Sequence, residues 1–279
     1  AAFLLENVKG LTNHNGGKTF ATILNVLTED LGYNVYYRVL NAKDYGLAQN
    51  RERIYIVGFR ENGGGFDYPE KDPIQKCIRD IIEENPVPAK YYLSDVYIAS
   101  IKRHRARHEA KGHGFGYEIR PLDGISNTIV CGGMGRERNL IIDPRQTDLT
   151  PTTHIKGEIN KDGWRRMTPM EWERLQGFPD NWTAGIADQH RYKQMGNSVA
   201  VPVIRKICYN MIKELLNPKP YVYYKEPEES PLFQTNASQT TRLFCTLRTS
   251  QALSLPPTLP SLERCYQPER TVHVHFHIT

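Results

Sequence analysis

The sequence predicts an α/β fold, because short apolar strands alternate with an amphipathic helix near its beginning. Residues 2–5 form an apolar run with the length of a buried strand. Apolar side chains then recur at helical spacing over residues 20–31. Residues 33–40 and 54–59 are rich in β-branched and aromatic side chains, which favour strands. A strand, a helix and two further strands in this order are typical of part of an α/β sheet.

The next part of the chain predicts a second, smaller structural region. Three consecutive glycines at 63–65 and several prolines interrupt the regular pattern. Ser94 is a suitable N-cap for a helix that reaches about Lys111. Short strands and glycine-rich turns follow this helix. We therefore expect residues 1–62 to belong to the α/β sheet and residues 63–160 to form a small mixed domain.

Two more helices return the chain to the first region. Thr168 fits the N-cap of a helix, Pro169 its first position, and Glu171 completes a capping box. A clean amphipathic pattern over 198–216 predicts a second helix. Both helices lie within residues 161–217, which we assign to the α/β region.

The tail and the composition exclude several classes of protein. Residues 218–279 hold clustered prolines with Ser and Thr, which predicts irregular chain. Three alternating histidines near the end lack a carboxylate or cysteine at ligand spacing, so we expect no metal site. Mean hydropathy is −0.56, and no apolar run is long enough for a membrane helix. The five scattered cysteines are typical of a reducing, cytoplasmic compartment, and the net charge of +5 favours an anionic partner.

Two short motifs near the strands carry candidate site residues. Glu6-Asn7-Val8 follows the first strand, where α/β folds place their ligands. Gln49-Asn50-Arg51-Glu52-Arg53 precedes the last predicted strand, and its two arginines point to one side of an extended chain. Such a pair suits a phosphate or a base carbonyl. The alternative for this segment is a surface salt-bridge ladder formed with Glu52.

Two later motifs accompany the predicted helices. The first runs from Arg165 to Pro179 and contains the capping box. The second is Gly196-Asn197-Ser198-Val199, which we interpret as a turn that enters the last helix. A helix start offers free backbone N–H groups to a polar ligand.

Together the four motifs resemble motifs VI, VIII, IX and X of the DNA cytosine-5 methyltransferases, in the order of that family, over residues 5–203. The resemblance implies a Rossmann-like domain that binds S-adenosylmethionine and a small DNA-recognition domain between the second and third motifs. In this family the target cytosine leaves the base stack. A cysteine thiolate attacks its C6, C5 takes the methyl group, and a base removes the C5 proton.

The resemblance also implies roles for individual residues. Glu6 would hold N3 and the exocyclic amine of the cytosine, and Arg53 would hold its carbonyl oxygen. Three neighbours would support this pocket: Asn7, Gln49 and Arg51. Two residues would contact the methionine part of S-adenosylmethionine: Asn197 and Ser198.

The sequence departs from the family pattern at two motifs. It contains neither the Phe-x-Gly-x-Gly cofactor loop nor the Pro-Cys-Gln loop that carries the nucleophile, and no cysteine has a Pro-Cys context. We therefore expect the chain to be the C-terminal portion of such an enzyme, inactive by itself and dependent on a missing N-terminal half or a complementary subunit. The strand at residues 2–5 would then expose an apolar edge.

Basic residues predict a surface that binds double-stranded DNA. The helix that follows Ser94 is rich in Lys and Arg, and phosphate contacts require such side chains. Thr128-Ile129 resembles the Thr-Leu pair of the family's recognition domains, and arginines in the next loop suit guanine readout. We expect DNA contacts from six residues: Lys102, Arg103, Arg105, Thr128, Arg136 and Arg138.

Three functional hypotheses follow from these patterns. The first is a DNA cytosine-5 methyltransferase of the restriction–modification type, in the cytoplasm of a bacterium or encoded by a phage. The second is a non-catalytic DNA-recognition subunit of a split methyltransferase. The third is a tRNA methyltransferase of the same superfamily, which the long basic recognition segment disfavours.

Overall fold

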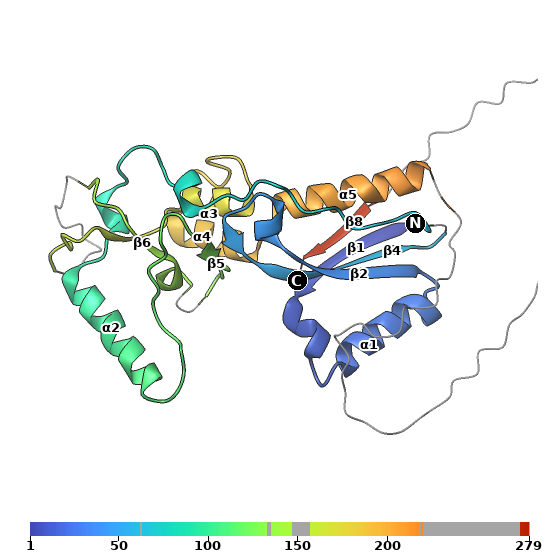
Figure 1. The fold of residues 1–279 in the computed structure, drawn as a ribbon, viewed down its shortest axis with the longest axis horizontal. Helices are drawn as coiled ribbons and strands as arrows, with labels where there is room; N and C mark the ends of the chain where they lie inside the picture. The colour runs from blue at the N-terminus through green and yellow to red at the C-terminus, as the bar shows by residue number, and fades with distance from the viewer. Residues whose placement is uncertain (62, 133–134, 147–156, 218, 220–273, 279) are drawn as a thin grey trace, which may run out of the picture. The chain divides into compact units, whose positions relative to one another are not determined.

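The computed structural model describes residues 1–61, 63–132, 135–146, 157–217, 219 and 274–278. All of these residues belong to one compact unit. The unit contains a four-stranded mixed sheet with helices on both faces, which confirms the α/β class (Figure 1). No helix within the described ranges has the length and apolarity needed to cross a membrane.

The sheet has the strand order β2-β4-β1-β8. Its strands are β1 (Ala2–Val8), β2 (Asn34–Asn41), β4 (Glu52–Phe59) and β8 (Val274–Ile278). β4 is antiparallel to both of its neighbours, whereas β8 runs parallel to β1. The three strands predicted from the first sixty residues are therefore confirmed; β1 and β4 are longer than predicted, and β2 is shifted by one residue.

Two expectations about the tail and the sheet edge are wrong. Residues 274–278 are not irregular, because they form β8. β8 pairs with β1 from Ala2 to Glu6, so the edge of β1 that we expected to be exposed is covered. An unpaired strand edge presents free N–H and C=O groups, which the backbone of a neighbouring strand can bind. The alternating Val, Phe and Ile of residues 274–278 favour such a strand. The rest of the predicted irregular tail lies outside the described residues.

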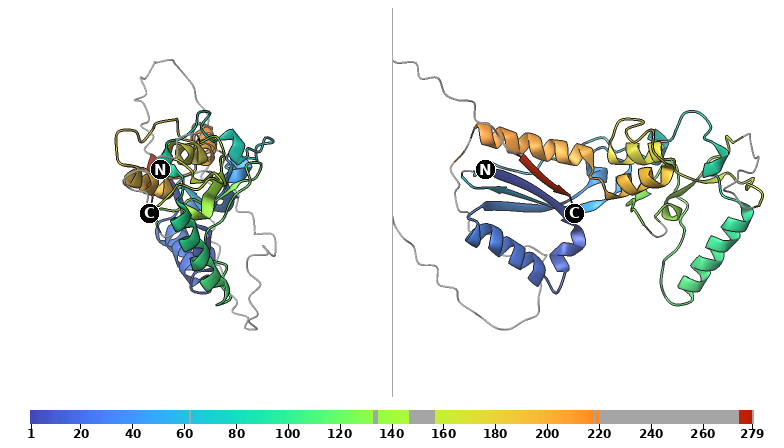
Figure 2. Two further views of the ribbon diagram at one scale, coloured as in Figure 1. Left: turned by 90° about the vertical axis from the view of Figure 1, so that its left-hand side faces the viewer. Right: turned by 180° about the vertical axis from the view of Figure 1, so that it is seen from behind.

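Helices cover both faces of the sheet, as seen from the front in Figure 1 and from behind in Figure 2. On one face α1 (Lys18–Asn25) packs through Phe20, and on the other α5 (Val201–Leu216) packs through Ile207. Alternate residues of β4 serve the two faces, because successive side chains of a strand point in opposite directions. Ile54 and Ile56 lie on the face that α1 covers. The residues on the face that α5 covers are Tyr55, Val57 and Phe59.

The other elements are shorter. They are β3 (Gln49–Asn50), α2 (Asp95–Glu109), β5 (Ser126–Asn127), β6 (Leu140–Ile142), β7 (Trp164–Arg166), α3 (Pro169–Gln176) and α4 (Asp188–Asn197). Single helical turns occur at Lys9–Asn13, Val26–Asp30, Ala42–Tyr45, Ile78–Asp80, Ala89–Tyr91 and Glu137–Asn139. β3 pairs with β5 in parallel, and β6 pairs with β7 in antiparallel orientation. The domain boundaries at 1–62, 63–160 and 161–217 stay predictions.

The predicted helix caps are confirmed. The Ser94 side chain accepts a hydrogen bond from the Tyr97 N–H at the start of α2. At the start of α3, the Glu171 N–H donates to Thr168 Oγ1 at 3.1 Å, and the Thr168 N–H donates to Glu171 Oε2 at 2.7 Å. Gly177 ends α3 with φ of 80°, a conformation that glycine adopts without strain.

The interpretation of the Gly-Asn motif is wrong. Gly196 and Asn197 are the last residues of α4 rather than a turn into the last helix, and α5 begins at Val201 instead of Ser198. α4 contains few apolar residues, so its sequence lacks the helical periodicity of a buried face. Gly196 is required for close packing, because a Cβ there would overlap the backbone of Val130 and Cys131.

Candidate functional site

Glu6 and Arg53 form a largely buried ion pair at the ends of two neighbouring strands. β1 and β4 are antiparallel, with Glu6 opposite Tyr55 and Val8 opposite Arg53. Arg53 Nε lies 3.2 Å from Glu6 Oε1, and the two side chains are 13% and 10% exposed. The contact lacks hydrogen-bond geometry, so Glu6 Oε1 is a buried acceptor without a hydrogen-bond partner among the described residues. A carboxyl in this state can form a new hydrogen bond with a ligand.

Burial raises the pKa of Glu6 above its ordinary value, and the nearby Arg53 and Arg51 guanidinium groups only partly oppose this effect. Removal from water disfavours the charged form of a carboxyl. The Glu6 carboxyl therefore takes up a proton at a higher pH than an exposed glutamate does. A protonated carboxyl both donates and accepts hydrogen bonds, which a carboxylate cannot do.

Arg51 is buried beside this pair, with 4% of the residue exposed. Its Nη1 donates to the Ile129 carbonyl at 3.2 Å, and its Nη2 donates to the Ser198 carbonyl at 2.7 Å. Burial lowers the pKa of Arg51 to about 10, with Arg53 acting in the same direction and Glu6 in the opposite one. Arg51 thus remains a cation at neutral pH, and it touches backbone carbonyls rather than the pair itself.

The other two predicted pocket residues differ in their surroundings. Gln49 is fully buried, and its Nε2 donates to the Leu175 carbonyl at 2.9 Å. Its Oε1 accepts from the Ile129 N–H at 3.1 Å. Asn7 accepts a local hydrogen bond from the Val8 N–H, so it shapes the end of β1. The structure brings Glu6, Arg51 and Arg53 together, with Gln49 beside the Ile129 segment.

The predicted cofactor residues lie at the C-terminal end of α4. Asn197 is exposed at the end of α4, and its side chain has no hydrogen bond within the described part of the chain. Ser198 Oγ donates to the Met195 carbonyl at 2.8 Å, while the Ser198 carbonyl receives Arg51. An exposed amide beside a fixed backbone suits a polar ligand such as an amino-acid moiety. Among the described residues, no group of three or more His, Cys, Asp or Glu side chains is arranged to hold a metal ion.

The predicted DNA contacts on α2 are not equivalent. Lys102 and Arg103 are exposed, and Lys102 Nζ lies 5.0 Å from the centre of the Trp164 ring. Arg105 is already engaged, because its Nε donates to Glu109 at 2.7 Å and its Nη1 donates to the Tyr117 carbonyl at 2.9 Å. The exposed pair is therefore better placed for phosphate contact than Arg105.

The remaining predicted DNA residues surround the segment that follows β5. Thr128 Oγ1 donates to the Asn50 carbonyl at 2.6 Å. The Arg136 guanidinium lies over the Tyr192 ring at 5.4 Å from its centre, and Arg138 lies 3.7 Å from a carboxylate oxygen of Glu118. These contacts hold the segment in place but leave its DNA-reading role a prediction.

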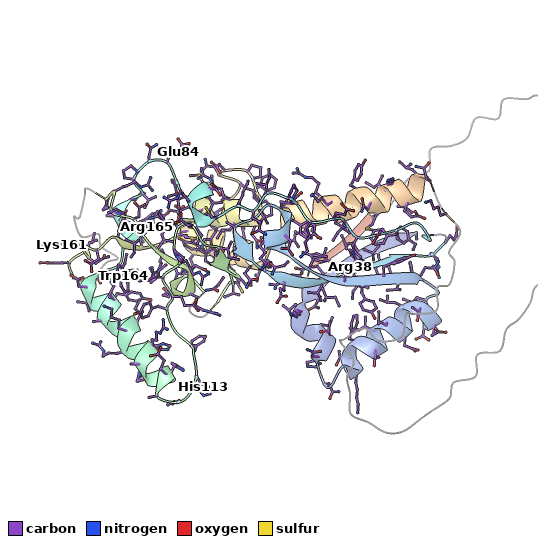
Figure 3. All side chains as sticks on the ribbon, in the orientation of Figure 1. Arg38, Glu84, His113, Lys161, Trp164 and Arg165 are labelled. Carbon is purple, nitrogen blue, oxygen red and sulfur yellow. The ribbon has the colours of Figure 1, made fainter. Side chains whose placement is uncertain are left out.

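A buried ionic cluster near α3 was not predicted. Arg165, which is labelled in Figure 3, donates to Glu171 Oε1 at 2.7 Å and to Asp143 Oδ2 at 2.9 Å. The three side chains are at most 3% exposed. Burial alone would lower the pKa of Arg165, but hydrogen bonds and charges from Glu171 and Asp143 raise it overall. The capping-box glutamate was a visible signal in the sequence, whereas the distant Asp143 was not. The cluster joins β6, β7 and α3.

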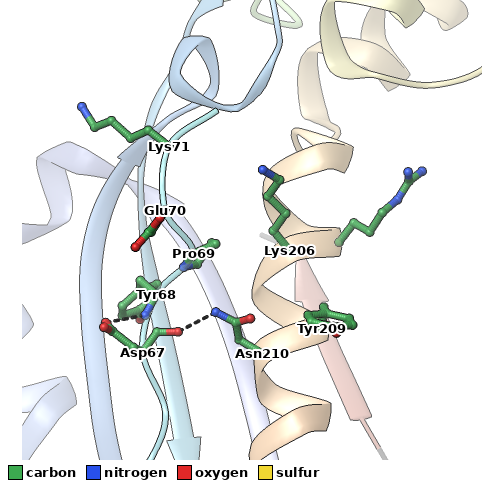
Figure 4. Close-up of a pocket in the computed structure, with 9 residues that line it drawn as sticks. Asp67, Tyr68, Pro69, Glu70, Lys71, Lys206, Tyr209 and Asn210 are labelled. Carbon is green, nitrogen blue, oxygen red and sulfur yellow. Dashed lines mark hydrogen bonds between the residues drawn. The ribbon is translucent and has the colours of Figure 1, made fainter. Parts of the chain in front are cut away.

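A groove of about 760 Å³ lies between the segment 67–71 and α5 (Figure 4). Asn210 Nδ2 crosses its floor to donate to the Asp67 carbonyl at 2.9 Å. None of the residues predicted for the site lines this groove, so we assign it no ligand.

Comparisons with known proteins identify the family of this chain. Residues 1–213 match the model of the C-5 cytosine-specific DNA methylase family, and the chain belongs to this family. The match lies in the N-terminal region of this chain, and it does not confirm the expectation that the chain is a C-terminal portion.

Two curated relatives extend this result. The chain is 59% identical over 221 residues to the Type II methyltransferase M.HpaII of Haemophilus parainfluenzae. The aligned region covers 77% of this chain and 61% of that protein. It is 39% identical over 219 residues to the Type II methyltransferase M.SsoII of Shigella sonnei, covering 77% and 53%. The chain thus spans between half and two thirds of the length of these relatives.

Solved structures support the fold alone. The Entamoeba histolytica methyltransferase EhMeth aligns with a TM-score of 0.57 at 18% identity, covering 77% of this chain and 63% of that one. The S. pombe Dnmt2 methyltransferase aligns with a TM-score of 0.54 at 19% identity, covering 77% and 67%.

Proposed function

We propose that this chain forms the base-binding and DNA-recognition part of a restriction–modification DNA cytosine-5 methyltransferase in a bacterial or phage-infected cytoplasm. The sheet would then be part of a Rossmann-like domain. The buried Glu6–Arg53 pair carries this proposal, because its hydrogen-bonding groups complement one edge of cytosine. A protonated Glu6 donates to N3 and accepts from the exocyclic amine, while Arg53 donates to the ring carbonyl.

The same pair prepares the base for reaction. Protonation at N3 withdraws electron density from C6, which is the atom that the thiolate of this family attacks. The raised pKa of Glu6 supports this role, since the carboxyl then holds its proton at a higher pH. Each of these hydrogen bonds is stronger when the flipped base lies in a pocket that excludes water.

Asn197 and Ser198 are the residues that we assign to S-adenosylmethionine, which supplies the methyl group when bound. The exposed Asn197 amide suits the amino-acid end of that cofactor. We attribute the nucleophilic cysteine and the glycine-rich cofactor loop to polypeptide outside these 279 residues, either as another part of one enzyme or as a complementary subunit. The chain alone would then bind duplex DNA through Lys102 and Arg103 without methylating it.

Methyl transfer from labelled S-adenosylmethionine tests this function. The chain is assayed alone and together with the part of M.HpaII that it does not cover, on duplex DNA and on tRNA. We expect transfer only in the mixture and only to DNA. In the mixture, Arg53→Ala should abolish transfer while duplex affinity stays within about threefold. Transfer by the chain alone, or an equal loss of affinity for every duplex in Arg53→Ala, contradicts the assignment.

The competing hypothesis of a non-catalytic recognition subunit gives a different result. Such a subunit would raise the DNA affinity of its partner, and Glu6→Gln would leave methyl transfer by the mixture unchanged. Loss of transfer in Glu6→Gln with retained DNA binding excludes it, because the proton donor to N3 would then come from this chain.

A further inference from the structure

Three segments that are distant in sequence meet at one buried junction. β3 pairs with β5, and the Ser126 N–H donates to the Ala48 carbonyl at 2.8 Å. Thr128 Oγ1 continues this ladder with its bond to the Asn50 carbonyl. The segment 128–131, which we call the recognition segment, is therefore aligned directly on the strand that leads to Arg53.

The recognition segment is held by hydrogen bonds to both backbone groups of Ile129. The Ile129 N–H donates to Gln49, and the Ile129 carbonyl accepts from Arg51. The Ile129 side chain is fully buried in a second core with Trp172. The position and orientation of this residue are thereby fixed from three directions.

The third segment of the junction carries the proposed cofactor residues. Arg51 also donates to the Ser198 carbonyl, which accepts a second bond from Gln176 Nε2 at 3.3 Å. Gly196 packs against the backbone of Val130 and Cys131 so closely that no side chain fits between them. Val130 and Cys131 nevertheless expose their own side chains, with 40% of Val130 accessible.

We propose that Arg51 is a positioning residue that ties the recognition segment to the base pocket, so that capture of a cytosine depends on the sequence around it. This inference rests on the proposed function. The planar guanidinium is suited to the task, because its donors bond two carbonyls in a fixed geometry. Arg51 precedes Arg53 by two residues on the segment that enters β4, so it is adjacent in the chain to a residue of the pocket. Without it, the exposed residues after Ile129 would lose their alignment with Glu6 and Arg53.

Selection from a duplex library tests the proposal with the full chain. Each duplex contains one unpaired cytosine or one unpaired thymine, flanked by random base pairs, and bound DNA is sequenced. The ratio of cytosine to thymine duplexes reports the pocket, and the enrichment of particular flanks reports the recognition segment. In Arg51→Met we expect flank enrichment to fall at least about tenfold, and the preference for cytosine over thymine to fall by a smaller factor. Arg51→Lys should give an intermediate enrichment, because an ammonium group is a point charge rather than a fork.

Arg38→Met is the matched control, since Arg38 is an exposed arginine on β2 outside the junction, and it should retain both preferences. Circular dichroism establishes that each variant is folded at the binding temperature. Wild-type flank enrichment in a folded Arg51→Met overturns the inference. If that variant does not fold, wild-type enrichment in Arg51→Lys overturns it instead. If the unaltered chain prefers neither cytosine nor any flank, the proposed function itself fails, and the inference fails with it.

Discussion

Replacing Arg165 with methionine tests the buried ionic cluster that joins β7 to α3. Methionine fills a similar volume but removes the three guanidinium hydrogen bonds that reach Glu171 and Asp143, at 2.7 to 2.9 Å. Both carboxyl groups would remain buried without their shared cation. Each keeps another partner, because Thr168 donates to Glu171 and Arg145 donates to Asp143.

The size of the expected effect follows from this arrangement. Removing one member of a buried ion pair costs about 3–5 kcal/mol, because a charge is left without compensation. The remaining partners place the loss near the lower limit, at about 3 kcal/mol. For a unit of this size, each kcal/mol shifts the melting temperature by about 2–4 °C, so Arg165→Met should melt roughly 6–12 °C lower.

The effect should also depend on pH. Burial would raise the pKa of Asp143, but hydrogen bonds and charges from Arg145 and Arg165 lower it to about 2. A carboxyl whose pKa is lowered by folding stabilises the fold at pH values above its ordinary pKa of 3.8. This contribution is lost as the pH falls toward 2. Arg165→Met loses part of this contribution. The difference from the unaltered chain should therefore be largest at neutral pH and should narrow in acid.

Thermal and urea unfolding monitored by circular dichroism measure these quantities. Arg38→Met is the control, because its exposed ion pair with Asp67 at 3.4 Å should contribute less than about 1 kcal/mol. A second change, Glu171→Gln in the Arg165→Met background, should recover part of the loss, since a neutral amide then replaces one of the two buried carboxylates. A loss below about 1 kcal/mol in Arg165→Met would refute the reasoning.

Three further predictions concern the pocket, the junction and α2. Binding to a duplex with an unpaired cytosine, measured by fluorescence anisotropy, should weaken as the pH rises through the raised pKa of Glu6, because the proton donated to N3 is lost. For Glu6→Gln the affinity should not change with pH in this range. An equal pH dependence in the two proteins contradicts the role of Glu6. Gly196→Ala should lower the free energy of unfolding by about 1–3 kcal/mol, because the new Cβ would overlap the Cys131 backbone. This loss outweighs the better helix propensity of alanine. An unchanged midpoint of urea unfolding would exclude this contact. Lys102→Ala and Arg103→Ala should weaken binding to all duplexes and each reduce the salt slope by about 1 in filter-binding assays, whereas a sequence-dependent loss would indicate base contact.

Local features of the fold were predictable because neighbouring residues determine them. The cap at Ser94 and the capping box of Thr168 and Glu171 follow from which side chains can satisfy free N–H groups. α4 was not predictable in this way, because it has few apolar positions and its final Gly196-Asn197 has the composition of a turn.

The proximity of two candidate site residues was predictable, but most of their contacts were not. Glu6 and Arg53 were expected in one pocket, and the antiparallel pairing of β1 and β4 brings them together. The bonds from Gln49 and Arg51 to Ile129 cross 80 and 78 positions of the chain, and no local pattern encodes them. The pairing of β8 with β1 is equally non-local, since it depends on which free edge the folded sheet offers.

The way in which Ile129 is held has a consequence for how this chain can evolve. Gln49 and Arg51 bind its N–H and carbonyl, which every amino acid except proline provides in the same form. Under the proposed function, substitutions at residues 130–132 would therefore change the side chains presented to DNA without disturbing either hydrogen bond. New sequence preferences would then arise by variation in this short segment, while the residues assigned to the cytosine stay the same.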